Sequence, residues 1–374
     1  MERHVRGKVV DLAIILVSAC AFACLGWRWN MALAGIVAPT LLIRFTRDRQ
    51  HWYGAFLPYP LLVLGTLLSM WKAWDLSPAM MIVLPCIRPI LFFPPLFLDR
   101  WARKRLGSFA ATFVFPASMV AVDYAMSFTP LATTLSGAVG LFGLRELSQV
   151  ASLGGIWALG FVAWWLASAL NAFFESGCDL RAAGAAAIVP LSVLAAALAF
   201  GSIRVATDPM GAPTVRVAGV TVAHPRDYWN LIDAKTPRDA TLAIVPETQK
   251  IEEGLFEASA RAAAAGAKLV VWSEGACVMN QDQEAVFIRR AESFAREKRI
   301  YLAAAVLVLR FGSGISDNKV LMFTPEGRQA YSYVKTISWY PTDSDGVLKV
   351  VDTPYGRVGT AICFDMDTPK FARG

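Results

Sequence analysis

Long apolar stretches separated by short polar connections occupy the first 205 residues of the chain. Each stretch has about 15 to 22 residues, close to the roughly 20 that an α-helix needs to cross the hydrocarbon core of a bilayer. They are residues 9–27, 31–45, 53–71, 79–98, 109–128, 153–174 and 185–205. The pattern predicts a multi-span α-helical membrane bundle of about seven helices over residues 1–205, and the second helix is the shortest.

The pattern changes after residues 206–213, which we interpret as a linker. Residues 214–222 alternate between apolar and polar side chains, which is typical of a half-buried strand. The following patterns predict helices at 251–266 and 283–299, strands at 268–273 and 301–309, and hairpins at 319–335 and 347–362. We therefore expect residues 214–374 to form a layered α/β domain.

Composition and charge agree with a membrane protein and exclude a nucleic-acid-binding protein. Hydrophobic residues make up 56% of the chain and charged residues only 17%, whereas soluble proteins have about 25% charged residues. The net charge is +7, and most of the basic excess lies before Gly211. A nucleic-acid-binding protein would instead carry a basic face on its soluble domain.

Basic residues alternate between the two sides of the predicted bundle. One side carries Arg3, Arg6, Lys8, Arg44, Arg47, Arg49, Arg100, Arg103, Lys104, Arg105 and Arg181, and the other carries Arg28, Lys72 and Arg145. The basic side is expected to be cytoplasmic. An odd number of spans then places the α/β domain on the other side, which is the periplasm if the membrane is a bacterial inner membrane.

Two charged residues, Arg88 and Asp123, fall inside apolar stretches. Charges within a membrane usually mark a functional site or pair with each other, and the sequence leaves both possibilities open. A transporter is a weaker interpretation that would rest on these two residues alone. Six cysteines and three histidines form no CxxC pair and no cluster, so we expect neither a disulfide framework nor a metal or other cofactor.

Three residues with reactive side chains follow predicted strands. Glu274 follows KLVVWS, Lys335 ends AYSYV, and Cys363 follows RVGTAI. Taken singly, each has an ordinary explanation: a solvated loop carboxylate, an exposed lysine and a small core cysteine. Together they supply a base, an ammonium group and a thiol. These groups suffice for acyl transfer, because the base activates the thiol and the ammonium stabilises the oxyanion.

The sequences WSEGA, YVKT and GTAICFD around these residues resemble those of the nitrilase (carbon–nitrogen hydrolase) superfamily. The apolar stretches before them, including FPASMVAVDY at 115–124 and residues 147–175, resemble its membrane-bound branch, the apolipoprotein N-acyltransferases. The resemblance implies an αββα sandwich at residues 214–374. It also implies that Glu274 is the general base, Lys335 holds the oxyanion and Cys363 forms a thioester.

The resemblance also implies two helper carboxylates, Asp343 and Asp365, although the family has the longer Glu at the first of these positions. Ser273 departs from the usual Trp-Pro-Glu. The implied reaction moves an acyl chain from a phospholipid to Cys363, and then to the N-terminal amine of a lipoprotein. Membrane lipids would therefore surround the protein, and no nucleic acid partner is expected.

The chain ends soon after Cys363, whereas the family continues with further strands and a final membrane helix. We therefore expect a nitrilase-like domain that is incomplete at its C-terminal end. Two alternatives to lipoprotein acylation stay open at this point. One is a membrane-tethered amidase or acyltransferase with another substrate, and the other is a non-enzymatic protein on the same scaffold.

Overall fold

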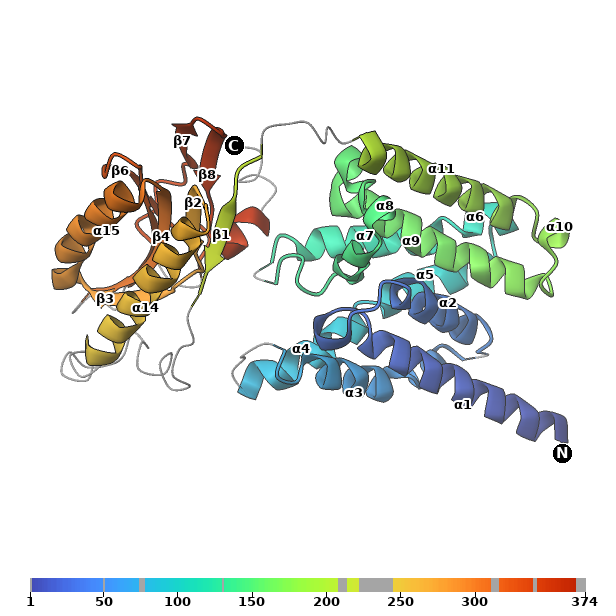
Figure 1. Ribbon diagram of the computed structural model, residues 1–374. Helices are drawn as coiled ribbons and strands as arrows, with labels where there is room; N and C mark the ends of the chain where they lie inside the picture. The colour runs from blue at the N-terminus through green and yellow to red at the C-terminus, as the bar shows by residue number, and fades with distance from the viewer. Residues whose placement is uncertain are drawn as a thin grey trace. The chain divides into compact units, whose positions relative to one another are not determined.

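The computed structural model describes residues 2–49, 51–73, 78–129, 131–207, 214–221, 245–310, 316–338 and 342–367. The chain divides into two compact units, Met1–Met210 and Gly211–Gly374 (Figure 1). Each unit has its own buried apolar core.

The first unit is helical. Its longer helices are α1 (Glu2–Ala23), α2 (Ala34–Arg47), α3 (Tyr59–Met70), α4 (Pro78–Ile90), α5 (Phe93–Arg103), α7 (Val114–Met126), α9 (Ala151–Glu175) and α11 (Ala185–Thr207). Short elements connect them: η1 (Trp27–Trp29), η2 (Trp52–Phe56), α6 (Ser108–Ala111), η3 (Gly137–Gly143), α8 (Arg145–Ser148) and α10 (Leu180–Ala183). Large side chains such as Phe22, Phe115 and Trp164 are buried where the helices pack together.

Five helical segments among the described residues are long and apolar enough to cross a membrane. They are Trp52–Met70, Pro78–Arg103, Ser108–Met126, Ala151–Glu175 and Ala185–Thr207, which match the third to seventh predicted spans. The first two predicted spans are shorter than expected. The apolar helix Val9–Ala23 ends before Gly26, whose φ is +111°, and α2 has 14 residues with Arg44 and Arg47 in its last turn.

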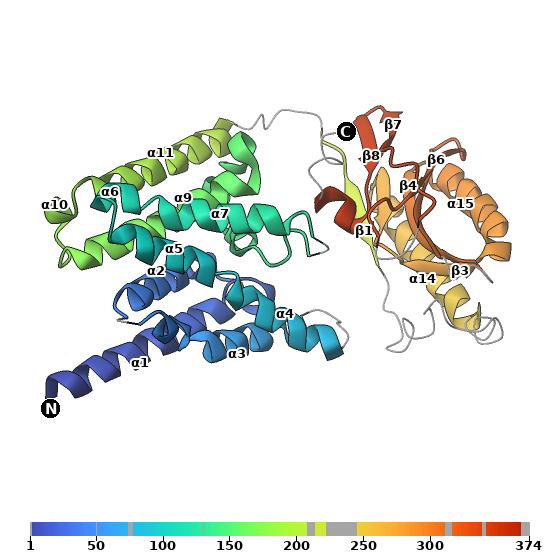
Figure 2. The ribbon, with the colours of Figure 1, turned by 180° about the vertical axis from the view of Figure 1, so that it is seen from behind.

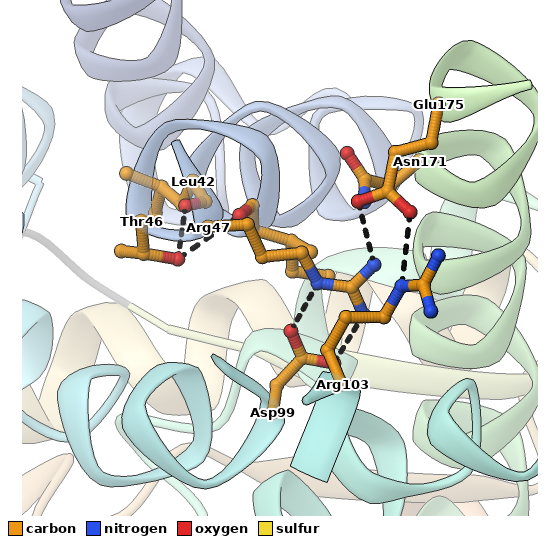
Figure 3. A network of polar contacts seen from close by, with 8 residues as sticks. Leu42, Thr46, Arg47, Asp99, Arg103, Asn171 and Glu175 are labelled. Carbon is orange, nitrogen blue, oxygen red and sulfur yellow. Dashed lines mark hydrogen bonds and ion pairs between the residues drawn. The ribbon is translucent and has the colours of Figure 1, made fainter. Parts of the chain in front are cut away.

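An ion-pair network around the buried Asp99 joins the C-terminal parts of α2, α5 and α9 (Figure 3). Arg47 donates from Nε and Nη2 to the two oxygens of Asp99, both at 2.7 Å, and from Nη1 to Glu175 at 3.0 Å. Arg103 contacts the other oxygen of Glu175 at 3.2 Å. The side chain of Asp99 is fully buried, so its charge depends on the bidentate contact with Arg47.

The second unit is built on a six-stranded sheet in the order β1-β2-β4-β5-β6, and β3 also pairs with β4. The strands are β1 (Val217–Val220), β2 (Leu269–Trp272), β3 (Cys277–Asn280), β4 (Tyr301–Leu309), β5 (Ser316–Phe323) and β6 (Gln329–Val334). The first four run parallel to one another, and β5 and β6 are antiparallel to their neighbours. Strands β7 (Lys349–Thr353) and β8 (Gly356–Thr360) form a separate two-stranded sheet.

Helices α14 (Val245–Ala264) and α15 (Glu284–Lys298) lie on the same face of the six-stranded sheet, as both views show (Figures 1 and 2). Phe256 of α14 packs against Trp272 of β2 and Phe294 of α15, with ring centroids 5.3 and 4.9 Å apart. Because side chains alternate along a strand, Leu269 and Val271 lie on the opposite face from Trp272.

The predicted elements of this unit are confirmed with small shifts. Both hairpins are present as β5–β6 and β7–β8, and the strand predicted at 301–309 is β4. Helix α14 begins at Val245 instead of Ile251, and Val222 lies outside the described residues. Strand β3 was not predicted, because four buried residues are too few to show an alternating pattern.

Candidate active site

Glu274 lies at an interruption between two strands that share one edge of β4. Strand β2 pairs with residues 301–303 of β4, and β3 pairs with residues 306–309. The chain turns between them at Gly275, whose φ of +62° is a conformation that glycine adopts without strain. The interruption places Glu274 at the carboxyl end of β2, where functional groups gather in α/β sheets.

Two side chains donate to the same oxygen of Glu274. The Nζ atom of Lys335 and the Nδ2 atom of Asn318 each lie 2.7 Å from Oε1. The pairing of β5 with β6 brings the two donors together, and the backbone N–H of Lys335 donates to the carbonyl oxygen of Asn318 at 2.9 Å. These contacts fix the orientation of the Glu274 carboxylate.

Cys363 follows β8 and has a φ of +50°, a left-handed conformation that is uncommon for residues other than glycine. Such conformations often occur at functional sites. The residue is exposed, and its thiol interacts electrostatically with Glu274 and Lys335. Partial burial and the Glu274 carboxylate raise the pKa of the Cys363 thiol, and the Lys335 ammonium opposes this shift. The thiol therefore rests protonated beside a carboxylate that can accept its proton.

A cavity of about 350 Å³ opens beside these groups. Leu269, Val271, Ala303 and Ala305 line it on the sheet face opposite α14 and α15, and residues 358–363 line it as well. Ala303 pairs in register with Val271, and its small side chain leaves space above the sheet. Glu274 and Cys363 both line the cavity, so a carbonyl group bound there can reach the thiol.

Asp365 is fully buried and connects the chain around Lys335 to the chain around Cys363. Its carboxylate accepts from the hydroxyl of Tyr333 at 2.6 Å and from the backbone N–H of Ile337 at 2.7 Å. The N–H groups of Thr336 and Ile362 donate to it as well, each at 3.1 Å. These contacts indicate that Asp365 positions the segments that carry Lys335 and Cys363.

Asp343, the other expected helper, contacts Arg310 at 3.4 Å, and its side chain is 65% exposed. No contact among the described residues joins it to Glu274, Lys335 or Cys363, so its catalytic role stays a prediction.

Asn318 contacts Glu274, but it was not singled out from the sequence. The only sequence signal for it is its position next to the predicted hairpin strand that begins at Lys319. The described residues contain no group of three His, Cys, Asp or Glu that could hold a metal ion.

Comparisons with known proteins give one family match and a likeness to a solved structure. Residues 242–373 match the family model of the carbon-nitrogen hydrolases. Among solved structures, the chain is similar to the crystal structure of Saccharomyces cerevisiae Nit3, a member of branch 10 of the nitrilase superfamily. The identity is 19%, the match covers 33% of this chain and 53% of the Nit3 chain, and the TM-score is 0.28. The match thus spans about half the length of Nit3, and no curated protein matches the chain.

The family match assigns a carbon–nitrogen hydrolase domain to residues 242–373. Glu274, Lys335 and Cys363 all lie within the matched residues. The first unit contributes several apolar helices to the same chain.

Proposed function

We propose that the protein is an acyltransferase that carries an acyl group as a thioester on Cys363. One observation carries the proposal: the Lys335 ammonium lies 2.7 Å from the Glu274 carboxylate, and Glu274 lines the same cavity as Cys363. The base and the nucleophile thus line one cavity, and the cation is paired with the base. The carbon–nitrogen hydrolase domain supports this chemistry.

In the first half of the reaction, the Cys363 sulfur attacks the acyl carbonyl carbon while Glu274 takes the thiol proton. The carbonyl oxygen becomes an oxyanion, which Lys335 stabilises with an N–H not used for Glu274, because an ammonium group has three donors. The ester C–O bond then breaks, and Glu274 returns its proton to the leaving alkoxide. The products are an acyl thioester and a free alcohol.

In the second half, an amine attacks the thioester carbon while Glu274 accepts one of its protons. The C–S bond breaks, and the proton passes from Glu274 to the departing thiolate. An amide leaves and the enzyme is restored. The same groups thus serve both halves, with Glu274 alternating between base and acid.

The proposed donor is a phospholipid and the proposed acceptor is the N-terminal amine of a lipoprotein. The apolar helices support this choice, because both substrates carry acyl chains and would meet the enzyme at a bilayer surface. The proposed location is a bacterial inner membrane with the second unit on the periplasmic side. In the alternative amidase reaction the donor is an amide, whose C–N bond breaks to release an amine in the first half, and water replaces the attacking amine in the second half.

The acceptor can be identified by following the acyl chain. Full-length protein is incubated with a phospholipid whose acyl chain is isotopically labelled and with a diacylglyceryl-cysteine peptide. The matched control peptide carries an acetylated N-terminus. Label in an amide of the free-amine peptide alone supports N-acyl transfer. Label released only as free fatty acid contradicts it and indicates hydrolysis.

A further inference from the structure

Arg88 is buried in the helical unit, in the last turn of α4 between Pro85 and Pro89, with 2% of its surface exposed. Its Nη2 atom donates to the carbonyl oxygen of Leu25, and its guanidinium lies 5.6 Å from the ring centroid of Phe22. The Nε and Nη1 atoms have no hydrogen-bond partner among the described residues. A buried cation with unpaired donors is costly, so such a group usually serves a ligand or a missing partner.

The guanidinium lines a cavity of about 300 Å³ within the first unit. The other lining residues are Leu25, Gly26, Trp27, Thr134, Ser136, Val139 and Gly140, from the loop after α1 and the segment around η3. The walls are thus mostly apolar, with one cation and two hydroxyl groups. This combination fits an amphiphile with an anionic group.

Asp123 does not satisfy the free donors of Arg88. Its carboxylate accepts from the hydroxyl of Ser136, which lines the same cavity. Arg88 and Asp123 interact electrostatically, but the described contacts include no direct ion pair between them. The two charged residues that the sequence singled out are therefore linked to one cavity, Asp123 through Ser136, and Arg88 keeps donors for a ligand.

We propose that this cavity binds the phosphate group of an anionic amphiphile, with Arg88 as the principal ligand. The unpaired Nε and Nη1 atoms can each donate to a phosphate oxygen, and Nη2 has a second N–H, besides the one directed at Leu25, that completes a fork with one of them. The hydroxyl of Thr134 lies in the same cavity and can add a hydrogen bond, whereas the hydroxyl of Ser136 already donates to Asp123. The apolar walls favour a phosphate attached to a glyceride over free inorganic phosphate, which would leave those walls in contact with water. The proposal does not depend on the proposed acyl transfer.

Binding can be measured by native mass spectrometry of the full chain in an uncharged detergent. The probes are dihexanoyl phosphatidic acid, dihexanoylglycerol, which lacks the phosphate, and inorganic phosphate. The variants are Arg88→Gln and Val139→Phe. Because Val139 lines the cavity and is 43% exposed, the larger side chain fills the cavity while Arg88 stays intact. Matched controls are Arg145→Gln, at an exposed arginine, and Val17→Phe, at a valine that is 51% exposed.

We expect one phosphatidic acid to bind per chain. Arg88→Gln should lower the affinity at least about tenfold, because a charge-assisted hydrogen bond is lost. Val139→Phe should lower it at least about tenfold as well, because the larger side chain fills the cavity. Both controls should bind like the original protein, and the two other probes should bind at least about tenfold more weakly. Unchanged binding in a folded Val139→Phe variant would overturn the proposal. So would inorganic phosphate that binds as tightly as the lipid, which would mark a simple anion site. If Arg88→Gln fails to fold, Val139→Phe decides the question.

Discussion

The hydroxyl of Tyr333 donates to the buried carboxylate of Asp365 at 2.6 Å, and this contact links the two chain segments that carry Lys335 and Cys363. Tyr333 lies two residues before Lys335 on β6, and Asp365 lies two residues after Cys363. Burial and the Asp365 carboxylate raise the pKa of Tyr333, so its hydroxyl stays a donor across the ordinary pH range. The spacing between ammonium and thiol therefore depends on a contact that involves neither group.

Replacing Asp365 with Asn should impair both folding and thioester formation. The carboxylate accepts four hydrogen bonds, and an amide nitrogen would face at least one backbone N–H donor in either orientation. We expect a loss of about 3 kcal/mol in stability of the second unit, since a buried charged acceptor is removed. Thermal unfolding and the rate of thioester formation measure the two effects.

Asp343→Asn is the matched control, because Asp343 is exposed and paired only with Arg310 among the described contacts. It should change stability by less than about 1 kcal/mol. The rate of thioester formation should fall more in Asp365→Asn than in Asp343→Asn. The opposite order would contradict the positioning role that the contacts of Asp365 indicate.

The reactivity of Cys363 should rise with pH in a way that its neighbours control. Burial and the Glu274 carboxylate raise the thiol pKa, whereas Lys335 lowers it. Glu274→Gln should therefore move the pH profile of alkylation to lower pH, and Lys335→Met should move it to higher pH, each by about one unit. Iodoacetamide labelling of Cys363, followed by peptide mass spectrometry, gives the profile.

Denatured protein provides the reference for this profile, since its cysteines should react with an ordinary thiol pKa of about 8.5. Cys277 is an internal control. It is buried, and its pKa is raised chiefly by that burial, so it should stay unlabelled in the folded chain. Shifts in the reverse directions for the two variants would contradict the described arrangement of charges.

The sequence was informative where a local pattern records burial. Strand β4 is apolar throughout and β5 and β6 flank a Pro-Glu-Gly turn, so these elements were predictable. Glu274, Lys335 and Cys363 could be singled out because each lies at the end of a predicted strand. The contact of Asn318 with Glu274 could not be predicted, because it depends on the register of β5 against β6. The contacts of Asp365 could not be predicted either, because they join backbone N–H groups of two chain segments, at Ile337 and at Ile362.

The ion pair between Arg47 and Asp99 should be the most sensitive polar contact of the helical unit. Asp99→Asn leaves a buried guanidinium without its bidentate partner, and we expect a loss of about 3 to 5 kcal/mol. Arg103→Gln is the control, because Arg103 is 37% exposed in its side chain and makes a single longer contact with Glu175. Its cost should stay below about 1 kcal/mol.

Unfolding of the full chain in mixed micelles, monitored by loss of helical circular dichroism, compares these two variants. Equal effects would mean that the network in Figure 3 contributes no more than a surface ion pair.

The most direct test of the proposed chemistry is a search for an acyl thioester on Cys363. Membrane-embedded full-length protein is incubated with phospholipid and examined by intact mass before and after hydroxylamine treatment. We predict a mass increase of one acyl chain that hydroxylamine removes, that is absent in Cys363→Ala and that forms more slowly in Glu274→Gln. An acyl adduct that persists in Cys363→Ala, or acyl transfer that proceeds unchanged in that variant, would contradict the assignment of Cys363 as the nucleophile.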